Sequence, residues 1–195
     1  MPKSDFTISK IDKQSAGSIL NQFHYLKDRS KGFKSGYNYG LHLNGELVGV
    51  CIFTGFPVPE LVVGMFGLPR DDQEGMFELS RLCLRPDVQA NEHNIASWFV
   101  SRAIKLLRKE TKVRCILSYA DADFHSGIVY RACNFKYYGL SDQKPDFWIK
   151  QPDGSFKKHS RGKTKGIEGE WRPRSQKHRY VLIYDKDLKI KWDSA

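Results

Sequence analysis

Two aspartates follow a largely apolar run and have the chemistry to accept a proton or to bind an amine. The run, residues 113–119, is typical of a strand buried on both faces, and Asp121 and Asp123 come shortly after it. Open α/β sheets bind their ligands at the carboxyl ends of their strands, so we expect one of these carboxylates at a functional site. A helix cap or a turn is the alternative role for either, and a spacing of two residues does not distinguish them.

A histidine, a tyrosine and an arginine elsewhere in the chain have complementary chemistry. His24, with an ordinary pKa of about 6.5, can act as a base or a metal ligand, although a solvent-facing histidine at a helix end is common. Tyr25 can stack on a planar base, donate a hydrogen bond or pack on a sheet. Arg81 lies among apolar neighbours in an expected strand, which favours binding of a phosphate or a donor group. Glu78 is three positions away, and strand alternation predicts that it lies on the opposite face.

Apolar periodicity predicts the elements that must position these residues. Strands are expected at 6–11, 37–43, 46–53, 76–84, 113–119, 135–139 and 180–184, and helices at 15–23, 95–107 and 126–133. Asn44-Gly45 suits a type I′ turn and predicts a hairpin, a second hairpin is expected over 148–158, and 54–75 is expected to be an irregular loop. A strand–helix–strand crossover requires parallel pairing, so the sheet is predicted to be mixed.

Length and composition are those of one folded domain. The 195 residues are 40% hydrophobic, enough for a single core. We divide the chain into a catalytic core, residues 1–145, and a basic extension, residues 146–195, that packs on it. No stretch approaches the roughly 20 apolar residues that span a bilayer, and no signal peptide is evident, which predicts a cytoplasmic protein without a membrane partner. The four cysteines lack Cys-x-x-Cys spacing and are expected to be buried small hydrophobes.

Positive charge is concentrated near the C-terminus. The chain carries a net charge of +10, and residues 150–180 hold ten Lys/Arg against three acidic residues, a net charge of +7. Such a segment is expected to contact the phosphates of nucleic acid, although a solvated basic surface or an acidic protein partner would use the same charges. The residues expected to contact DNA are Lys157, Lys158, Arg161, Lys163, Lys165, Arg172, Arg174, Lys177 and Arg179.

Four segments carry a recognisable pattern. They are Phe23-His24-Tyr25-Leu26-Lys27, Glu78-Leu79-Ser80-Arg81-Leu82, the region 118–139 with Ser118-Tyr119-Ala120-Asp121 and His125-Ser126-Gly127, and the tail 173–180. With these segments in this order, the chain resembles the Mom family of phage DNA-modification proteins, which have a GNAT (N-acetyltransferase-like) core. The resemblance implies an α/β fold with a mixed, mostly antiparallel central sheet flanked by helices.

The resemblance also implies a reaction and a site. Mom proteins place a carbamoylmethyl group on N6 of adenine in double-stranded phage DNA, which protects that DNA from host restriction enzymes. The family's functional residues correspond to His24, Tyr25, Arg81, Asp121 and Tyr130. In GNAT enzymes a tyrosine near the last of these protonates the leaving group, whereas core packing is its alternative role. Further candidates are Ser118, Asp123 and His125, and if iron takes part its ligands would be His24, Tyr25 and Asp121.

The expected donor depends on the connection that follows strand 76–84. Acetyl-CoA enzymes of this fold hold the pyrophosphate on a glycine-containing loop, but residues 91–96 read Asn-Glu-His-Asn-Ile-Ala, and Glu92 would repel a phosphate. The donor is therefore expected to be acetyl-CoA or a glycine-derived compound such as an aminoacyl-tRNA. Two other functions fit the same residues. One is an ordinary GNAT acyltransferase acting on an amine of protein, RNA or a small molecule, and the other is a non-catalytic DNA-binding protein.

Overall fold

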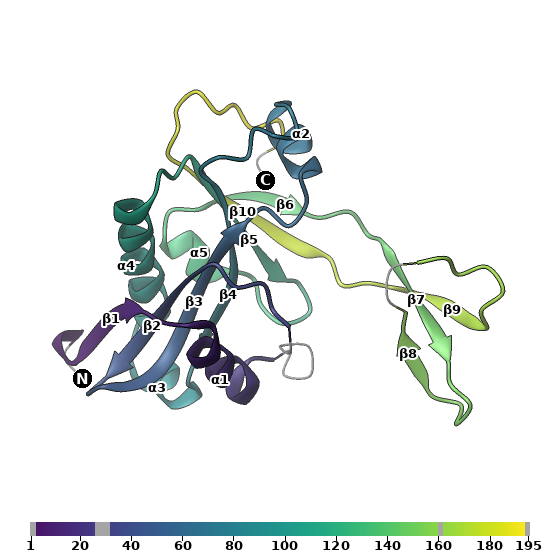
Figure 1. Ribbon diagram of the computed structural model, residues 1–195, viewed down its shortest axis with the longest axis horizontal. Coiled ribbons are helices and arrows are strands. Elements are labelled where there is room, and N and C mark those ends of the chain that lie inside the picture. Colours follow the sequence, from purple (N-terminus) through teal and green to yellow (C-terminus); the bar gives the residue numbers. More distant parts are fainter. Residues whose placement is uncertain (1–2, 26–31, 160–161, 194–195) are drawn as a thin grey trace.

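A seven-stranded sheet with the order β1-β2-β3-β4-β5-β10-β6 forms the centre of the protein (Figure 1). The computed structural model describes residues 3–25, 32–159 and 162–193. The strands of this sheet are β1 (Phe6–Lys10), β2 (Tyr37–Leu43), β3 (Glu46–Gly55), β4 (Met76–Leu84), β5 (Cys115–Asp121), β6 (Lys136–Leu140) and β10 (Lys177–Ile183). Among the described residues only β4 and β5 pair in parallel, so the sheet is mixed and mostly antiparallel, as predicted.

Helices cover both faces of this sheet. They are η1 (Lys3–Asp5, a 3₁₀ turn), α1 (Lys13–Phe23), α2 (Glu60–Phe66), α3 (Pro86–Asn91), α4 (Ile95–Glu110) and α5 (Ile128–Ala132). The apolar face of α4 packs with Cys51 and Phe53, whereas α1 packs with Val50 and Ile52. Alternate residues of β3 therefore face different helices, so α1 and α4 lie on opposite faces of the sheet.

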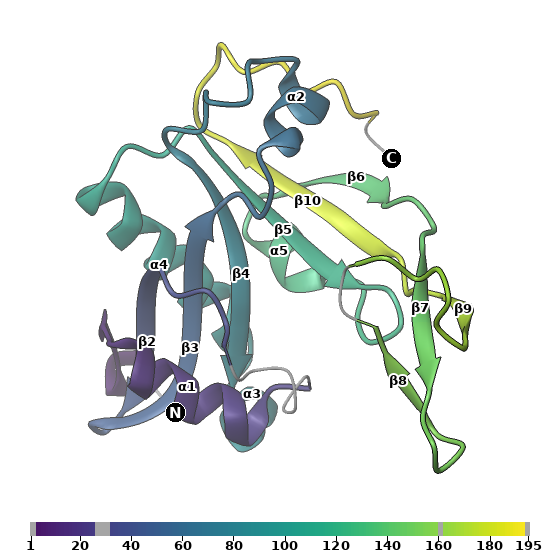
Figure 2. The same cartoon turned by 45° about the vertical axis from the view of Figure 1, so that its right-hand side comes forward.

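A second, three-stranded sheet projects from the first. Its order is β8-β7-β9, formed by β7 (Pro145–Lys150), β8 (Phe156–Lys158) and β9 (Gly169–Pro173). We call residues 145–173 the arm; in Figure 2 it stands beside the carboxyl end of β5 and apart from β1 to β4. The two segments that join the arm to the main sheet, 141–144 and 174–176, are tied together. The Gln143 side chain donates to the carbonyl of Arg174 at 2.6 Å, and the Gln176 side chain donates to the carbonyl of Ser141 at 2.7 Å.

The expected strands and the three expected helices are present, with ends shifted by a few residues. The Asn44-Gly45 hairpin is confirmed, with φ of 51° and 85° at its two turn residues, and the 148–158 hairpin is confirmed by the pairing of β7 with β8. The expectation of an irregular loop at 54–75 is wrong, because this stretch contains α2, whose Val62, Met65 and Phe66 are buried. The periodicity also did not indicate α3 or β9, which are short.

The C-terminal segment supplies an internal strand of the central sheet. We expected residues 146–195 to pack on the core as an extension; β10, within that segment, lies between β5 and β6 and pairs antiparallel with both. All four cysteines are free and buried, as expected. Of the residues described, no helix combines the length and the apolar character needed to cross a bilayer.

Gly127 makes a testable contribution to this fold. Its φ is +73°, and a Cβ there would lie 2.4 Å from the ring of Tyr180. Gly154, in the turn between β7 and β8, has a φ of +82° but open space around it. In chemical denaturation, Gly154→Ala should cost about 1 kcal/mol from the left-handed backbone alone. Gly127→Ala should cost about 2 kcal/mol more, because the methyl group also displaces the Tyr180 ring. Equal losses in the free energy of unfolding for the two variants would show that the contact with Tyr180 does not affect stability.

Candidate functional site

The parallel strands β4 and β5 separate where the candidate residues lie. They pair from Met76 with Cys115 to Leu79 with Ser118 and no further. A cleft of about 1270 Å³ opens beyond this point and is bounded on one side by the arm. Sequence candidates from several distant segments line it together: His24, Tyr25, Arg81, Asp121, Asp123, His125, Tyr130, Lys158, Arg174 and Lys177.

A β-bulge in β4 places two charged residues in the cleft. Arg81 pairs with Ile52 and Leu79 pairs with Phe53, so Ser80 is an extra residue that reverses the alternation of side chains. As a result Glu78 and Arg81 lie opposite Thr54 and Ile52, two residues apart on β3, and so share one face of the sheet. The sequence-based expectation that they lie on opposite faces is therefore wrong, because regular alternation takes no account of a bulge.

Glu78 is a candidate that the sequence reasoning did not select. Burial raises the pKa of its carboxyl, and the neighbouring Arg81 only partly opposes this rise. Arg81 itself donates from its guanidinium to the carbonyl of Ser80 at 2.6 Å. A buried carboxyl with a raised pKa is a stronger base than an ordinary one once it is ionised. The signal in the sequence was a carboxylate within a mostly apolar strand.

His24 lies at the inner end of a stack of aromatic rings. It is 6% exposed, and burial, together with the nearby charges of Arg81 and His125, lowers its pKa to about 4. Its imidazole is therefore neutral at pH 7. The ring of Tyr25 stacks on it at 4.5 Å, and the ring of Phe124 lies 4.8 Å beyond Tyr25. The rings of His125 and Tyr25 meet edge to face, with their centroids 5.5 Å apart.

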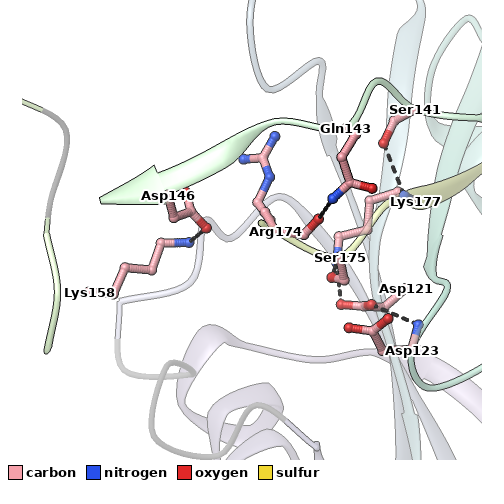
Figure 3. A network of polar contacts seen from close by, with 9 residues as sticks. All are labelled: Asp121, Asp123, Ser141, Gln143, Asp146, Lys158, Arg174, Ser175 and Lys177. Carbon is pink, nitrogen blue, oxygen red and sulfur yellow. Dashed lines mark hydrogen bonds and ion pairs between the residues drawn. The ribbon is translucent and has the colours of Figure 1, made fainter. Parts of the chain in front are cut away.

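Asp121 is held in an ionised state by the strand beside it. Antiparallel pairing sets Lys177 opposite Asp121, and the Lys177 ammonium forms an ion pair with the Asp121 carboxylate (Figure 3). The backbone N–H of Asp123 donates to the same carboxylate at 3.2 Å. Burial alone would raise the pKa of Asp121, but hydrogen bonds from Lys177, Ser175 and Asp123 lower it overall. Asp123 itself is exposed, so the structure distinguishes the two carboxylates by their surroundings.

Tyr130 lines the cleft, and Ser118 lies behind it. Burial raises the pKa of the Tyr130 phenol to about 12, against a smaller opposing effect of its hydrogen bond with Ser118. The phenol therefore keeps its proton at neutral pH and can donate it. Ser118 is fully buried, and its hydroxyl donates to the carbonyl of Leu79 at 3.1 Å. It does not line the cleft, so its place is behind Tyr130 as a support.

The residues expected to contact DNA fall into two groups. Internal partners engage four of them: Lys158 pairs with Asp146, Arg172 with Glu170, Lys177 with Asp121, and the Arg179 guanidinium lies 4.5 Å from the ring of Trp192. Within the described part of the chain, no ion pair is seen for Lys157, Lys163, Lys165 and Arg174. Arg161 lies outside the described residues.

The three residues expected to bind iron all line the cleft. The Asp121 carboxylate forms an ion pair with Lys177, and the ring of Tyr25 stacks on that of His24. Over residues 3–25, 32–159 and 162–193, no cluster of three or more His, Cys, Asp or Glu side chains could hold a metal ion.

The connection before α4 fits a pyrophosphate better than its sequence indicates. Asn94 adopts a φ of 59°, the left-handed conformation that a glycine usually supplies at this place. Glu92, from which a repulsion of phosphate was expected, is only 6% exposed and does not line the cleft. Ala96, in the first turn of the 16-residue helix α4, lines the cleft. Backbone N–H groups at this helix end would hold the phosphates of an acyl-CoA.

The splayed parallel pair, the mixed sheet and the helix that follows β4 define the GNAT fold, and solved structures agree. The ribosomal-protein-S18-alanine N-acetyltransferase from Escherichia coli aligns with a TM-score of 0.53 at 15% identity, covering 94% of this chain and 99% of that one. An acetyltransferase from Bacillus subtilis, in complex with CoA, aligns with a TM-score of 0.52 at 14% identity, covering 92% and 97%. An IAA acetyltransferase from Bacillus cereus gives 0.53 at 12%, covering 92% and 99%.

The chain belongs to the Mom protein family, whose family model matches residues 5–194. The resemblance inferred from the sequence motifs is thereby confirmed. A comparison with curated proteins gave no match.

Proposed function

We propose that this protein is a group transferase that adds a carbamoylmethyl-type group to N6 of adenine in double-stranded phage DNA. Membership of the Mom family and the GNAT fold support a transferase. The observation that carries the proposal is the cleft, which gathers Glu78, Arg81, Asp121 and Tyr130 beside the basic arm. The modification would protect phage DNA from restriction in the cytoplasm of the host cell.

The cleft residues supply the proton transfers that this chemistry needs. The N6 amine of adenine is a weak nucleophile, because its lone pair is delocalised into the ring, so a base must remove a proton as the new bond forms. Glu78 suits this role, because burial raises the pKa of its carboxyl. Asp121, whose pKa is lowered, suits a hydrogen bond from the N6 amino group. Tyr130 would protonate the leaving group, and Arg81 would hold negative charge on the donor.

Two classes of donor remain candidates for the group that is transferred. The conformation of Asn94 and the burial of Glu92 suit an acyl-CoA, and a similar GNAT structure contains CoA. A glycine-derived donor such as an aminoacyl-tRNA would deliver a glycyl group, with the terminal hydroxyl of the tRNA as the leaving group. The glycyl group is an isomer of the carbamoylmethyl group, so a rearrangement that moves the N6 bond from the carbonyl carbon to the methylene carbon would complete the product. The arm and Arg174 would contact the DNA backbone from the other side of the cleft, so donor and DNA would approach from different directions.

Nucleoside mass spectrometry tests this function. Plasmid DNA from cells that express the protein should contain a deoxyadenosine about 57 Da heavier than normal, and DNA from cells expressing Glu78→Gln should not. Unmodified DNA together with tight duplex binding would instead identify a non-catalytic DNA-binding protein. Acetyl transfer from acetyl-CoA to a peptide, RNA or small-molecule amine, with unmodified DNA, would identify an ordinary GNAT acyltransferase.

A further inference from the structure

Three rings in contact run from the inside of the cleft to the protein surface: Tyr25 stacks on His24, and Phe124 lies tilted by 39° against Tyr25. His24 is 6% exposed, Tyr25 is 45% exposed, and Phe124 at the outer end is 61% exposed. Successive ring centroids are 4.5 and 4.8 Å apart. The inner two rings therefore brace the third from behind, while much of the Phe124 ring is open to solvent.

The loop that carries Phe124 holds this ring in a defined place. The backbone N–H groups of Phe124 and His125 donate to the carbonyl of Asp121 at 3.0 and 2.9 Å, and that of Asp123 donates to the Asp121 side chain. The turn is thus anchored on the carboxyl end of β5. A phenylalanine side chain loses about 2 kcal/mol of favourable transfer energy when it stays in water. An exposed ring that is both anchored and braced indicates a surface that is covered when a partner binds.

The chemistry around Phe124 identifies the partner as nucleic acid. Arg174, for which no ion pair is seen among the described residues, lines the same cleft, and the segment 150–180 has a net charge of +7. Trp148 lines the wall formed by the arm. The exposed ring suits a flat aromatic group, and the positive charge suits an anion. A nucleotide of DNA has both, because its base is flat and aromatic and its phosphate is anionic.

We propose that Phe124, braced by Tyr25 and His24, stacks against the bases of duplex DNA beside the target adenine and so stabilises its extrusion into the cleft. This inference rests on the proposed function, because it explains how an N6 amine inside a duplex reaches the catalytic residues. Extrusion of a paired base costs a few kcal/mol, and stacking of a base on an aromatic side chain returns about 1–3 kcal/mol. Proteins that kink DNA use exposed phenylalanines in this way.

A comparison of paired and unpaired target adenines tests the inference. The rate of modification is measured on a duplex with the adenine opposite thymine and on the same duplex with the adenine opposite an abasic site. Phe124→Ala should lower the rate about 10- to 100-fold on the paired adenine and only a few-fold on the unpaired one, because the lost stacking matters when a pair must be opened. Phe124→Trp should retain the rate. Val63→Ala, which removes an exposed apolar side chain of α2, is the surface control.

The outcomes separate this inference from the proposed function. Equal effects of Phe124→Ala on the two duplexes, or no effect on either, would overturn the inference while modification by the wild-type protein stands. If the wild-type protein modifies no DNA, the proposed function fails, and fluorescence of 2-aminopurine at the target position still tests extrusion. Wild-type protein should raise this fluorescence and Phe124→Ala should not; an equal rise, or no rise with wild-type protein, would overturn the inference.

Discussion

Replacement of Asp121 by alanine is expected to lower modification of adenine by about 10²- to 10⁴-fold while leaving the affinity for duplex DNA within a few-fold. The carboxylate is 7% exposed, lines the cleft and forms an ion pair with Lys177. Its removal deletes an acceptor for the N6 amino group and leaves the Lys177 ammonium without its partner. Nucleoside mass spectrometry measures the first effect, and a duplex-binding titration measures the second.

Two further variants show what kind of role Asp121 has. Asp121→Asn keeps the shape of the side chain and an acceptor oxygen but removes the charge, so an activity close to that of the alanine variant would mean that the charge is required. Asp123→Ala tests the competing carboxylate, which is exposed and supports Asp121 through its backbone N–H alone. Loss of activity in Asp123→Ala, with full activity in Asp121→Ala, would transfer the role to Asp123. Thermal unfolding of each variant separates lost chemistry from lost folding.

The second large effect is a loss of folding stability at low pH, which is expected from the buried His24. Its pKa is lowered from 6.5 to about 4, with burial as the main cause. Below pH 6.5 the unfolded chain binds a proton at this residue before the folded protein does, so stability falls as the pH drops through this range. The contribution of neutral His24 to the free energy of unfolding is fully present above about pH 6.5 and is lost by about pH 4. The loss is as large as ~3 kcal/mol, from 1.36 kcal/mol per pKa unit.

Denaturation at several pH values checks this effect. The His24→Gln variant should show a smaller fall in stability between pH 6.5 and 4 than the wild-type protein, whereas His93→Gln, at an exposed position outside the cleft, should fall as the wild-type protein does. Activity limited by protonation of His24 should likewise decline only as the pH approaches 4. A decline centred near pH 6.5 that disappears in His24→Gln would show that His24 is not shielded from solvent.

Local sequence was a good guide to elements whose stability is local. The Asn44-Gly45 turn and the strand Met76–Leu84 occur as predicted, because turn conformation and strand propensity are encoded by neighbouring residues. The helix α2 was missed because it contains Gly64, Val62 and Val63, which are weak helix formers. Its buried residues pack with Leu188 and residues of β5 and β10, far along the chain, and this packing stabilises the helix.

The candidate site likewise combines features that the sequence predicted with contacts that only the folded chain shows. The family resemblance of the sequence motifs selected His24, Arg81, Asp121 and Tyr130, and the density of lysine and arginine near the C-terminus predicts a phosphate-binding surface. Which side chains meet depended on pairing between distant strands. A bulge in β4 turned Glu78 to the same side as Arg81, and the insertion of β10 beside β5 placed Lys177 against Asp121.

Strand register explains why these contacts could be learned only from the folded chain. A shift of one residue moves a side chain to the other face of a sheet, and the choice of neighbour depends on the sum of many contacts between segments remote in sequence. Composition and periodicity describe a strand by itself. They therefore identified the chemical groups of this protein, whereas the packing of the whole chain determined which groups share the cleft and which charges are neutralised within it.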